Sequence, residues 1–433
     1  MHDGYRAKVA RRPVRHREDG NVHGTALSMT DDAPAPGPTT GRWLFPVALF
    51  LSISTLLILV VWQTGVHLPR APGAGPADPA IPAGEWLEGW VRWDAGWYLS
   101  IARDGYFYVP GSQSSIAFFP AYPLALDAAA FVVGDPFVAG MLVTWVSGLG
   151  VALLFWRWSR ARMAPSAART ALVLLLVFPY AWFLHLSIYA DALFIVAILG
   201  SFILLDHDHP WLAGVVGMVA TAARPVGLAV VVGLAMRALE RRGALRVPDR
   251  ISARVRLRLP TGIKLDRVRP ADAGVLLSLG GLGAWCAYLA VRFGDPLAFA
   301  AAQAAPGWEQ SAGPRTWFKI AFVGQLLRGD PVVATRLAVQ AALTVGALLL
   351  VPLVVRRFGW GYAAFCLAVV ALPAISTKDF QGMGRYLLAA FPLFAVAGDL
   401  LDSRPRLRVA VVTVSAAGLV FLTSLSARGY YLT

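Results

Sequence analysis

Long apolar runs, separated by short polar and charged segments, recur from Leu44 onward. A helix needs about 20 mostly apolar residues to cross the hydrocarbon core of a bilayer. Backbone groups in lipid must be hydrogen-bonded within the protein, and the period-2 alternation of a membrane barrel is missing from these runs, so the runs predict helices. We expect eleven spans, near 43–65, 137–156, 170–186, 190–205, 210–222, 225–238, 272–292, 333–355, 358–375, 385–400 and 408–425.

The run 116–133 is apolar enough for a short span but contains Pro120, Pro123 and one aspartate. We expect it to form a re-entrant or interfacial helix within the first outer loop. In the alternative it is a true span, and the four-arginine loop after Trp156 then lies outside, against the positive-inside rule. A single long span over Pro225 would restore the later register. Both topologies stay open at this point.

Composition agrees with a lipid-embedded fold, since 57% of the residues are hydrophobic and only 15% are charged. That leaves too little polar surface to cover a soluble protein of 433 residues. The net charge of +14 could suggest nucleic-acid binding, but the basic residues lie between apolar runs and match no nucleic-acid-binding motif. Their placement is the positive-inside pattern, with eleven Lys and Arg in the segment 237–271 alone. The sequence predicts an all-α polytopic membrane protein with membrane lipid, and no nucleic acid, as a partner.

The domain organisation follows from the same pattern. We expect residues 1–41 to be a disordered basic cytoplasmic tail and 42–433 to be one transmembrane domain. The first apolar run comes too late for a cleavable signal peptide, so it is expected to be an uncleaved anchor, and Met29 is an alternative start. The excess of Arg over Lys, 35 to four, indicates a GC-rich bacterial genome and hence a bacterial plasma membrane. Cys286 and Cys366 lie inside apolar runs, which speaks against a disulfide or zinc site.

This topology places four kinds of polar segment on the outer face: the long first loop 67–136, the turns around Ile188 and Arg224, the second loop 293–332 and the loop 376–384. The first loop contains Arg92-Trp93-Asp94-Ala95-Gly96-Trp97-Tyr98, and Asp104 follows six residues later. An acid between Trp and Tyr side chains suits carbohydrate chemistry, because aromatic faces stack on sugar C–H surfaces and the carboxylate can accept a hydroxyl proton. An interfacial aromatic belt with incidental charges is the alternative interpretation.

Three cations, Arg224, Lys378 and Arg385, lie near the outer ends of predicted spans. Charges there are costly unless they are paired or hydrated, and arginine suits a bidentate grip on phosphate oxygens. Helix-end snorkelling toward lipid headgroups is the alternative for each of them. Asp191, after a short turn between two spans, is either a functional acid or a structural partner for Arg224. His185 is expected to be a hydrogen-bonded packing residue.

Together these segments resemble the PIG-V-like family, which comprises GPI mannosyltransferase 2 and its bacterial homologues and has GT-C architecture. The resemblance extends in order from Glu85 to Pro392, and Asp191 stands where a Glu is commoner in the family. Beyond the first loop it is carried by Phe178-Pro179-Tyr180, Ser187-Ile188-Tyr189-Ala190-Asp191-Ala192-Leu193-Phe194, Ala223-Arg224-Pro225-Val226-Gly227, Phe293-Gly294-Asp295-Pro296-Leu297 with Gln303 and Trp308, and Gly384-Arg385-Tyr386-Leu387-Leu388 with Phe391-Pro392.

The resemblance implies a one-step inverting transfer of mannose from polyprenyl-phosphate mannose to an acceptor hydroxyl on the outer face. A donor of this kind also fits the topology, because nucleotide sugars are soluble cytoplasmic metabolites. Asp94 is then the general base, and Arg224, Lys378 and Arg385 bind the donor phosphate. Residues expected to bind or support the sugar or acceptor are Arg92, Trp93, Trp97, Tyr98, Asp104, Tyr189, Asp191, Gln303, Trp308 and Tyr386.

Several alternatives remain. A transporter or flippase for a lipid-linked sugar has similar topology, although we find no internal repeat of the kind that transporters show. The same fold could use another polyprenyl-phosphate sugar, and the acceptor could be a glycolipid, a polysaccharide or a protein. No metal is required, but a divalent cation held by Asp94, Asp104 and Asp191 is an open alternative, since their spacing is not diagnostic.

Overall fold

The computed structural model describes residues 41–74, 85–246 and 259–432. The expected tail 1–41, apart from Gly41, and the alternative start Met29 lie outside the described residues, as do parts of the two loops 67–136 and 237–271. The chain divides into two units, Met1–Arg42 and Trp43–Thr433, and only the second is described below.

Helices make up nearly all of the regular structure. The α-helices are α1 (Gly41–His67), α2 (Glu85–Glu88), α3 (Asp94–Asp104), α4 (Ala121–Val133), α5 (Pro136–Arg160), α6 (Pro165–Leu176), α7 (Asp191–Asp206), α8 (Pro210–Ala223), α9 (Leu228–Arg241), α10 (Gly280–Phe293), α11 (Ala298–Gln303), α12 (Pro314–Trp317), α13 (Ile320–Arg328), α14 (Pro331–Phe358), α15 (Trp360–Ser376), α16 (Met383–Ala389), α17 (Phe391–Asp402) and α18 (Pro405–Ala427). Short 3₁₀ segments are η1 (Ser115–Ala117), η2 (Ala181–Leu184), η3 (Pro225–Gly227), η4 (Leu265–Arg267) and η5 (Pro270–Leu279). Two antiparallel strands, β1 (Leu245–Arg246) and β2 (Gly262–Ile263), pair Leu245 with Ile263.

Helix ends follow from local sequence signals. The carboxylate of Asp135 caps α5 by accepting a hydrogen bond from the Val138 amide at 3.0 Å, and Pro136 occupies the first turn, where its missing N–H costs nothing. Asp330 and Pro331 start α14 in the same way. Gly134 adopts a left-handed conformation (φ 84°) and ends α4.

Every one of the eleven segments expected to span the membrane contains helix. Within the described residues, five helices are long and apolar enough to cross a bilayer, or six if α16 and α17, bent by 79°, form one broken span. Several others, such as the 16-residue α7, are shorter than a full crossing, so the total of eleven stays a prediction. Helix α4 has 13 residues and is about 20 Å long at 1.5 Å per residue. Helices α6 and α8, which belong to predicted spans, have similar lengths of 12 and 14 residues, so whether 116–133 crosses the membrane stays a prediction.

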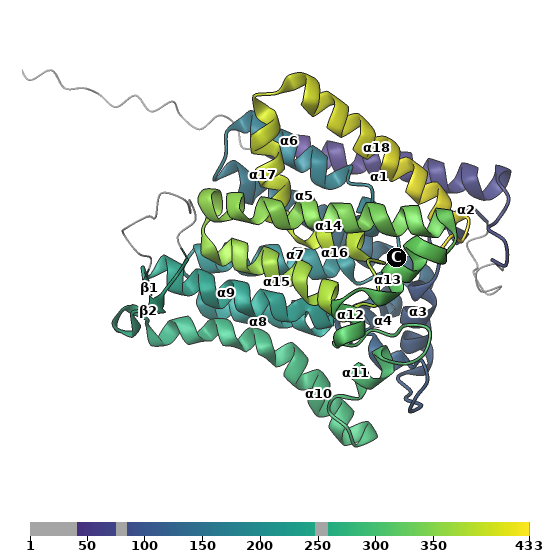
Figure 1. Ribbon diagram of the computed structural model, residues 1–433, viewed down its shortest axis with the longest axis horizontal. Helices are drawn as coiled ribbons and strands as arrows, with labels where there is room; N and C mark the ends of the chain where they lie inside the picture. The colour runs from purple at the N-terminus through teal and green to yellow at the C-terminus, as the bar shows by residue number, and fades with distance from the viewer. Residues whose placement is uncertain (1–40, 75–84, 247–258, 433) are drawn as a thin grey trace, which may run out of the picture. The chain divides into compact units, whose positions relative to one another are not determined.

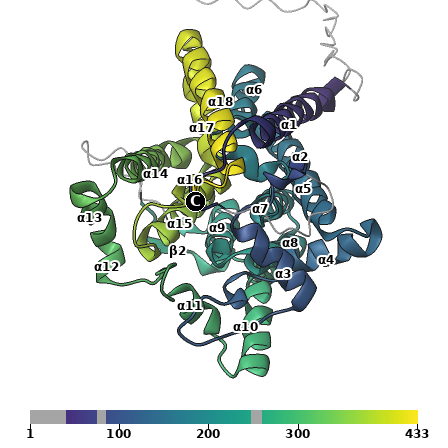
Figure 2. The ribbon, with the colours of Figure 1, turned by 90° about the vertical axis from the view of Figure 1, so that its right-hand side faces the viewer.

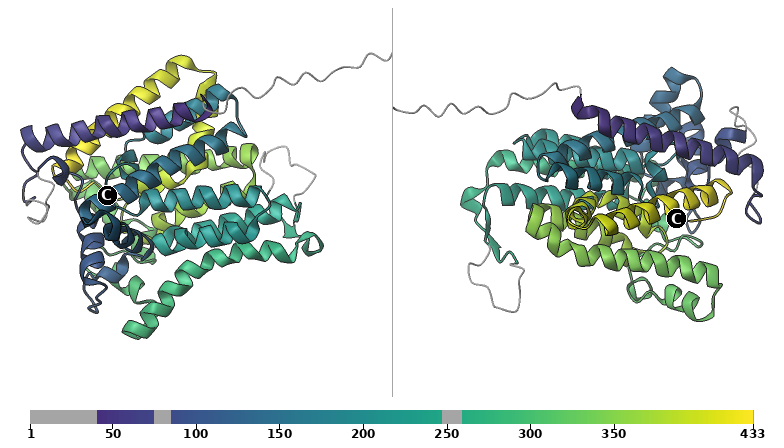
Figure 3. Two further views of the ribbon diagram at one scale, coloured as in Figure 1. Left: turned by 180° about the vertical axis from the view of Figure 1, so that it is seen from behind. Right: turned by 90° about the horizontal axis from the view of Figure 1, so that it is seen from above.

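The long helices run side by side, with α7 inside the bundle (Figures 1 and 3). Most side chains of α7 are buried, and the helix packs on α5, α8, α9 and α16. Helices α3, α11, α12 and α13 gather at one end, which we call the site end; Figure 2 looks onto it. Strands β1 and β2 lie at the opposite end.

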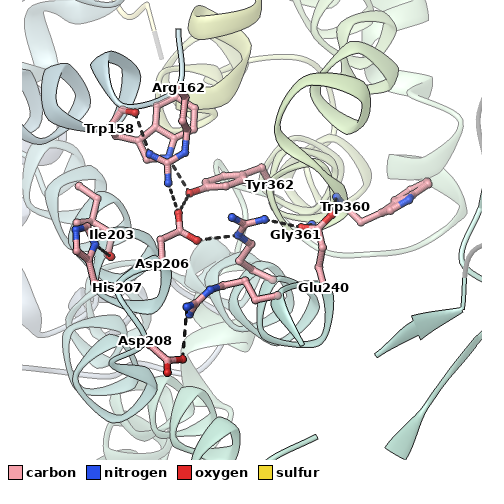
Figure 4. Close-up of polar contacts among 12 residues, drawn as sticks. Trp158, Arg162, Ile203, Asp206, His207, Asp208, Glu240, Trp360, Gly361 and Tyr362 are labelled. Carbon is pink, nitrogen blue, oxygen red and sulfur yellow. Dashed lines mark hydrogen bonds and ion pairs between the residues drawn. The ribbon is translucent and has the colours of Figure 1, made fainter. Parts of the chain in front are cut away.

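A polar network joins four helices at the end opposite the site end (Figure 4). Asp206, the last residue of α7, accepts hydrogen bonds from Arg162, from Arg237 Nε at 2.8 Å and from the Tyr362 hydroxyl at 2.5 Å. Glu240 of α9 accepts a hydrogen bond at 2.6 Å from the backbone amide of Trp360, the first residue of α15. The network therefore ties the ends of α5, α7, α9 and α15 together.

Candidate functional site

A cavity of about 470 Å³ lies at the site end. It is enclosed by α3, the break between α8 and α9, the loop 303–312, the end of α15, the loop 376–382, α16 and the segment after α18. Among the residues that line it are Asp94, Tyr98, Phe118, Arg224, Gln303, Trp308, Lys378, Arg385, Tyr386 and Tyr431. Segments far apart in the sequence therefore meet here.

Two carboxylates and two guanidiniums form a chain of ion pairs along the cavity. Arg385 Nη1 donates to Asp94 Oδ2 at 2.9 Å, and its Nε lies 3.7 Å from Asp191 Oδ1. Asp191 Oδ1 in turn accepts a hydrogen bond from Arg224 Nη1. The four side chains sum to zero formal charge, which makes their burial tolerable because a buried charge needs a partner.

The positions of these four residues follow from breaks in the helices. Asp94 and Asp191 are the first residues of α3 and α7, where the helix dipole favours a negative charge. Pro225 disfavours helical geometry in the residue before it, and Arg224 is extended (φ −157°, ψ 148°), so its side chain leaves the helix line. A Cβ on Gly384 would lie 2.3 Å from the Tyr180 ring, so glycine lets α16 approach closely beside Arg385.

Hydrogen bonds to the backbone around Asp94, as well as the ion pair with Arg385, hold this residue in place. The Tyr189 hydroxyl accepts a hydrogen bond from the Asp94 amide at 3.2 Å and donates one to the Arg92 carbonyl at 2.9 Å. Trp93, between them, has φ 57° and ψ −115°, a conformation that is strained for a residue with a side chain. Within the described part of the chain, Asp94 Oδ1 makes no hydrogen bond, and the carboxyl lines the cavity. One oxygen of Asp94 is thus fixed and the other is available to a ligand.

Aromatic rings form a second wall of the cavity. Trp97 stacks on Phe118, with ring centroids 5.6 Å apart, and lies 5.5 Å from Trp308 in an edge-on arrangement. Phe118 and Trp308 line the cavity, and Gln303 next to them donates to the Ala117 carbonyl at 3.3 Å. Tyr386 lies under the guanidinium of Arg224, 4.7 Å from ring centroid to Cζ.

Lys378 lines the cavity but already has a partner, because its ammonium donates to the Glu309 carboxylate. That hydrogen bond lowers the pKa of Glu309. Lys319 fixes the loop that carries Lys378 by donating to the carbonyls of Thr377 at 2.5 Å and Asp379 at 3.1 Å. Burial lowers the pKa of Lys319 to about 8, and the nearby carboxylate of Asp379 partly opposes this. Two lysines of the outer loops are therefore engaged with the loop 376–382.

The structure brings most of the predicted site residues together at this cavity. Trp97, Tyr189 and Asp191 do not line it but contact residues that do.

Asp104, Arg92 and Trp93 are the exceptions. Asp104, at the far end of α3, is exposed and paired with Arg103 at 2.9 Å, away from the cavity. Arg92 donates to Glu88 and to the Ala427 carbonyl, and lines a different cavity of about 670 Å³ on the other face of α3. Trp93 lines the same larger cavity as Arg92. That larger cavity is mostly apolar, so we place the site in the smaller one, which contains the chain of ion pairs.

Sequence reasoning missed Arg336 and Tyr431. Arg336 of α14 donates to Gln381 Oε1 at 3.2 Å and to the Tyr431 carbonyl, beside the cavity. A charge near the start of a predicted span is a functional signal in itself, and it could have identified Arg336. Tyr431 lies in a short polar segment whose two tyrosines resemble any interfacial belt. Its placement depends on tertiary contacts alone.

A metal site finds no support in the described residues, where no group of three or more His, Cys, Asp or Glu side chains could hold an ion. Asp104 is remote from Asp94 and Asp191, and these two are both engaged by arginines. We therefore derive no step through a metal. The two cysteines, Cys286 and Cys366, are free thiols.

The known proteins that this chain resembles are found by comparing structures. No protein-family model matches the sequence, and no curated protein matches it. The chain is similar to ArnT from Cupriavidus metallidurans bound to undecaprenyl phosphate, with a TM-score of 0.50 and 14% identity over 91% of this chain and 78% of that one. This chain has the GT-C fold. The apolar helices and this likeness make it a multi-pass membrane protein.

Two further structures come from Archaeoglobus fulgidus. The apo oligosaccharyltransferase has a TM-score of 0.45 and 10% identity, and the match covers 88% of this chain and 56% of that one. AglB in complex with an inhibitory peptide and a dolichol-phosphate has a TM-score of 0.41 and 12% identity, again over 88% and 56% of the two chains. The chain thus spans little more than half the length of these proteins.

Proposed function

We propose that this protein is an inverting membrane glycosyltransferase that moves mannose from polyprenyl-phosphate mannose to an acceptor hydroxyl, with Asp94 as general base. The observation that carries the proposal is the chain of ion pairs from Asp94 through Arg385 and the buried Asp191 to Arg224, because Asp94, Arg385 and Arg224 all line one cavity. A base and fixed cations facing one space are what transfer from a sugar phosphate requires. The cavity, at about 470 Å³, has the size of a small-ligand site, for which about 300–1,000 Å³ is usual.

The transfer is a single displacement at the anomeric carbon. Asp94 takes the proton of the acceptor hydroxyl as its oxygen forms the new bond to that carbon. The bond from the anomeric carbon to the phosphate oxygen breaks on the opposite face, and the lipid phosphate leaves with the electron pair. The free oxygen of Asp94 is placed for this role, because Arg385 fixes the other one.

The departing phosphate gains negative charge, so cations should lie on the side of the leaving group. Arg224 is suited to this because it lines the cavity three contacts away from Asp94 along the chain of ion pairs. Lys378 lines the same cavity and would exchange Glu309 for the phosphate. Beside Arg224, the exposed apolar side chains of Leu228, Leu372 and Ile375 also line the cavity and suit the start of a polyprenyl tail. A polyprenyl-phosphate ligand at this place agrees with the undecaprenyl phosphate that is bound by the structurally similar ArnT.

The sugar assignment is supported by sequence motifs and by the aromatic wall. The PIG-V-like pattern supplies mannose and the outer-face location, and the charged loops between the apolar runs support that orientation. Phe118 of the first loop and Trp308 of the second loop offer ring surfaces to a sugar. Another polyprenyl-phosphate sugar would use the same machinery, so the donor is a question for experiment.

The test is sugar transfer by the purified protein in detergent from radiolabelled synthetic polyprenyl-phosphate mannose to octyl α-mannoside. Asp94→Asn keeps the shape of the side chain but cannot accept the proton, so we expect kcat to fall about a hundred- to ten-thousand-fold. Asp104→Asn is the matched control: it removes an acid from the other end of the same helix, where the side chain is exposed and outside the cavity. Its rate should equal that of the wild type.

Each result decides between the alternatives. Since detergent leaves no bilayer to cross, a lipid-linked sugar transporter yields no glycoside product. Transfer that survives in Asp94→Asn at the wild-type rate would show that another group is the base. Transfer from the corresponding glucose or arabinose donor, but not from mannose, would keep the mechanism and replace the sugar.

A further inference from the structure

The five residues that follow α18 cross the site end and return to the cavity. We call residues 428–432 the strap. Helix α18 ends at Ala427, and Gly429 (φ 89°) has the left-handed conformation that turns the chain. The Arg428 carbonyl accepts a hydrogen bond from the Ala71 amide at 2.8 Å, and Arg428 Nε donates to the Pro69 carbonyl at 2.7 Å. The start of the strap is therefore fixed to the segment after α1.

The middle of the strap is fixed from both sides of the cavity. Trp93 Nε1 donates to the Tyr430 carbonyl at 3.3 Å, from the α3 side. Arg336 of α14 donates to the Tyr431 carbonyl, and through its other nitrogen it holds Gln381 at 3.2 Å. Leu432 is 4% exposed and so anchors the strap in the apolar core. The backbone at Tyr431 is thus held in place, and its side chain is the part left at the surface of the cavity.

Two large aromatic rings stand exposed next to the proposed base. Tyr431 is 42% exposed and Trp93 is 46% exposed, and their ring centroids are 4.7 Å apart. Tyr431 lines the same cavity as Asp94. Trp93 directly precedes Asp94 in the chain and lines the larger cavity on the other face of α3, so the pair of rings stands between the two cavities. Leaving two such rings in contact with solvent forgoes hydrophobic stabilisation that burial would provide. Paired rings beside a carboxylate form a surface that suits the apolar face of a sugar ring.

We propose that Tyr431 is the acceptor-positioning residue of the transfer reaction: its ring, held against Trp93, packs on the sugar of a glycoside acceptor, and its hydroxyl orients the acceptor toward Asp94. This rests on the proposed function. The acceptor must approach Asp94 from the side opposite the phosphate, and Tyr431 is on the Asp94 side because it packs on Trp93. Its hydroxyl makes no hydrogen bond to the rest of the described chain, so it is available to a ligand.

The chemistry of the phenol fits orientation and not proton transfer. Packing against its neighbours withdraws part of the phenol from water, and this, together with the nearby carboxylate of Asp94, raises the pKa of Tyr431 to about 12. The hydroxyl stays protonated at neutral pH and can donate a hydrogen bond to an acceptor oxygen while accepting another. The proton of the reacting hydroxyl still goes to Asp94, so Tyr431 adds position and selectivity to the displacement without taking part in bond breaking.

The experiment measures KM separately for the donor and for the acceptor, octyl α-mannoside, in the transfer assay. Tyr431→Phe keeps the ring on Trp93 and removes only the hydroxyl. One lost hydrogen bond predicts an acceptor KM about three- to tenfold higher, with the donor KM within about twofold of the wild type. Tyr431→Ala removes the ring too and should raise the acceptor KM further. Tyr430→Phe is the matched control, because it deletes a hydroxyl from the neighbouring strap residue outside the cavity.

Every outcome bears on the proposal. If the wild type transfers mannose and Tyr431→Phe has an unchanged acceptor KM, or if donor and acceptor constants change alike, the positioning role is wrong while the proposed function stands. If Tyr430→Phe has the same effect as Tyr431→Phe, the strap is only structural and the role is also wrong. If the wild type consumes no polyprenyl-phosphate sugar at all, the proposed function fails and this inference fails with it. Thermal unfolding of each variant confirms that the kinetic comparison is between folded proteins.

Discussion

Arg385 connects the two carboxylates of the cavity and is enclosed by aromatic rings. Its guanidinium lies 5.5 Å from the Phe183 ring and 5.4 Å from the Tyr189 ring, and its side chain is 13% exposed. A guanidinium in such a setting is held by its ion pairs, since a buried charge without a partner costs several kcal/mol. Asp94 is therefore presented to the cavity in a fixed orientation, which is what a base in a displacement reaction requires.

Two substitutions of Arg224 distinguish a structural role of this residue from a role in binding the donor. Arg224→Lys keeps the charge that balances Asp191 but loses the planar fork that grips phosphate, so we expect the donor KM to rise about tenfold with near-normal stability. Arg224→Gln should raise the donor KM further and also lower the unfolding temperature, because buried Asp191 loses a partner. Kinetics with varied donor, together with thermal unfolding in detergent, measure both effects.

The control for Arg224 is Arg315→Gln, which removes an exposed arginine of α12 outside the cavity and should change neither quantity. A donor KM that stays normal in both Arg224 variants would reduce Arg224 to a structural partner of Asp191.

Broken helices supply the polar groups of the site. The α8–α9 break at Arg224 and the 79° bend between α16 and α17, which follows Arg385, both occur within apolar segments. Irregular backbone at membrane depth is tolerated where it faces protein or a hydrated cavity. Each break directs a helix end or an arginine into the cavity. The breaks in these helices therefore also determine where the site lies.

The network at the opposite end holds the same bundle together, and Asp206 is its centre (Figure 4). Asp206→Asn would leave Arg162 and Arg237 without their shared carboxylate. We expect a loss of about 3–5 kcal/mol in the free energy of unfolding, because removing one partner of a buried pair leaves an unbalanced charge. The rate of transfer per folded molecule should change little, since the network is remote from the cavity.

The matched control for Asp206 is Asp208→Asn, two residues further along. Its carboxylate pairs with Arg242 at 2.7 Å but is 48% exposed, so its loss should cost less than about 1 kcal/mol. Thermal unfolding in the same detergent compares the two variants. Equal stability of both would show that the network does not tie the four helices.

At the scale of the whole molecule, the two ends of the bundle carry different chemistry. The site end has the acids, rings and phosphate-binding candidates, while the opposite end carries arginine-rich helix ends. By the positive-inside rule, the site end should face outside. Single cysteines test this in a chain whose Cys286 and Cys366 are replaced by Ser.

A membrane-impermeant maleimide added to intact cells should label Ser112→Cys, an exposed residue of the first loop, and should fail to label Ser403→Cys until the cells are permeabilised. Both residues are exposed, so protein burial does not explain a difference between them. The reversed pattern would place the cavity in the cytoplasm, where soluble nucleotide sugars are available. The argument for a lipid-linked donor would then lose its topological support.

The sequence alone predicted the helical membrane fold, helix in each of the eleven apolar segments and most of the residues that the structure gathers at the candidate site. Apolar runs and basic loops are local properties, because the transfer of each side chain into lipid depends mainly on that side chain. Pro225 and the acids at the starts of α3 and α7 are equally local signals. Motif resemblance implied the roles of Asp94 as general base and of Arg224 and Arg385 as phosphate-binding cations, but it gave no distances between them.

Only the tertiary structure decided which of these side chains meet. Asp94 and Arg385 are 291 residues apart in the sequence, and their 2.9 Å contact depends on how the intervening helices pack. The same packing excluded Asp104, engaged Lys378 with Glu309, and brought Tyr431 to the cavity with Arg336 beside it. Hydropathy fixes which segments enter the membrane. Complementary packing between helices fixes which faces touch, and no short stretch of sequence contains that information.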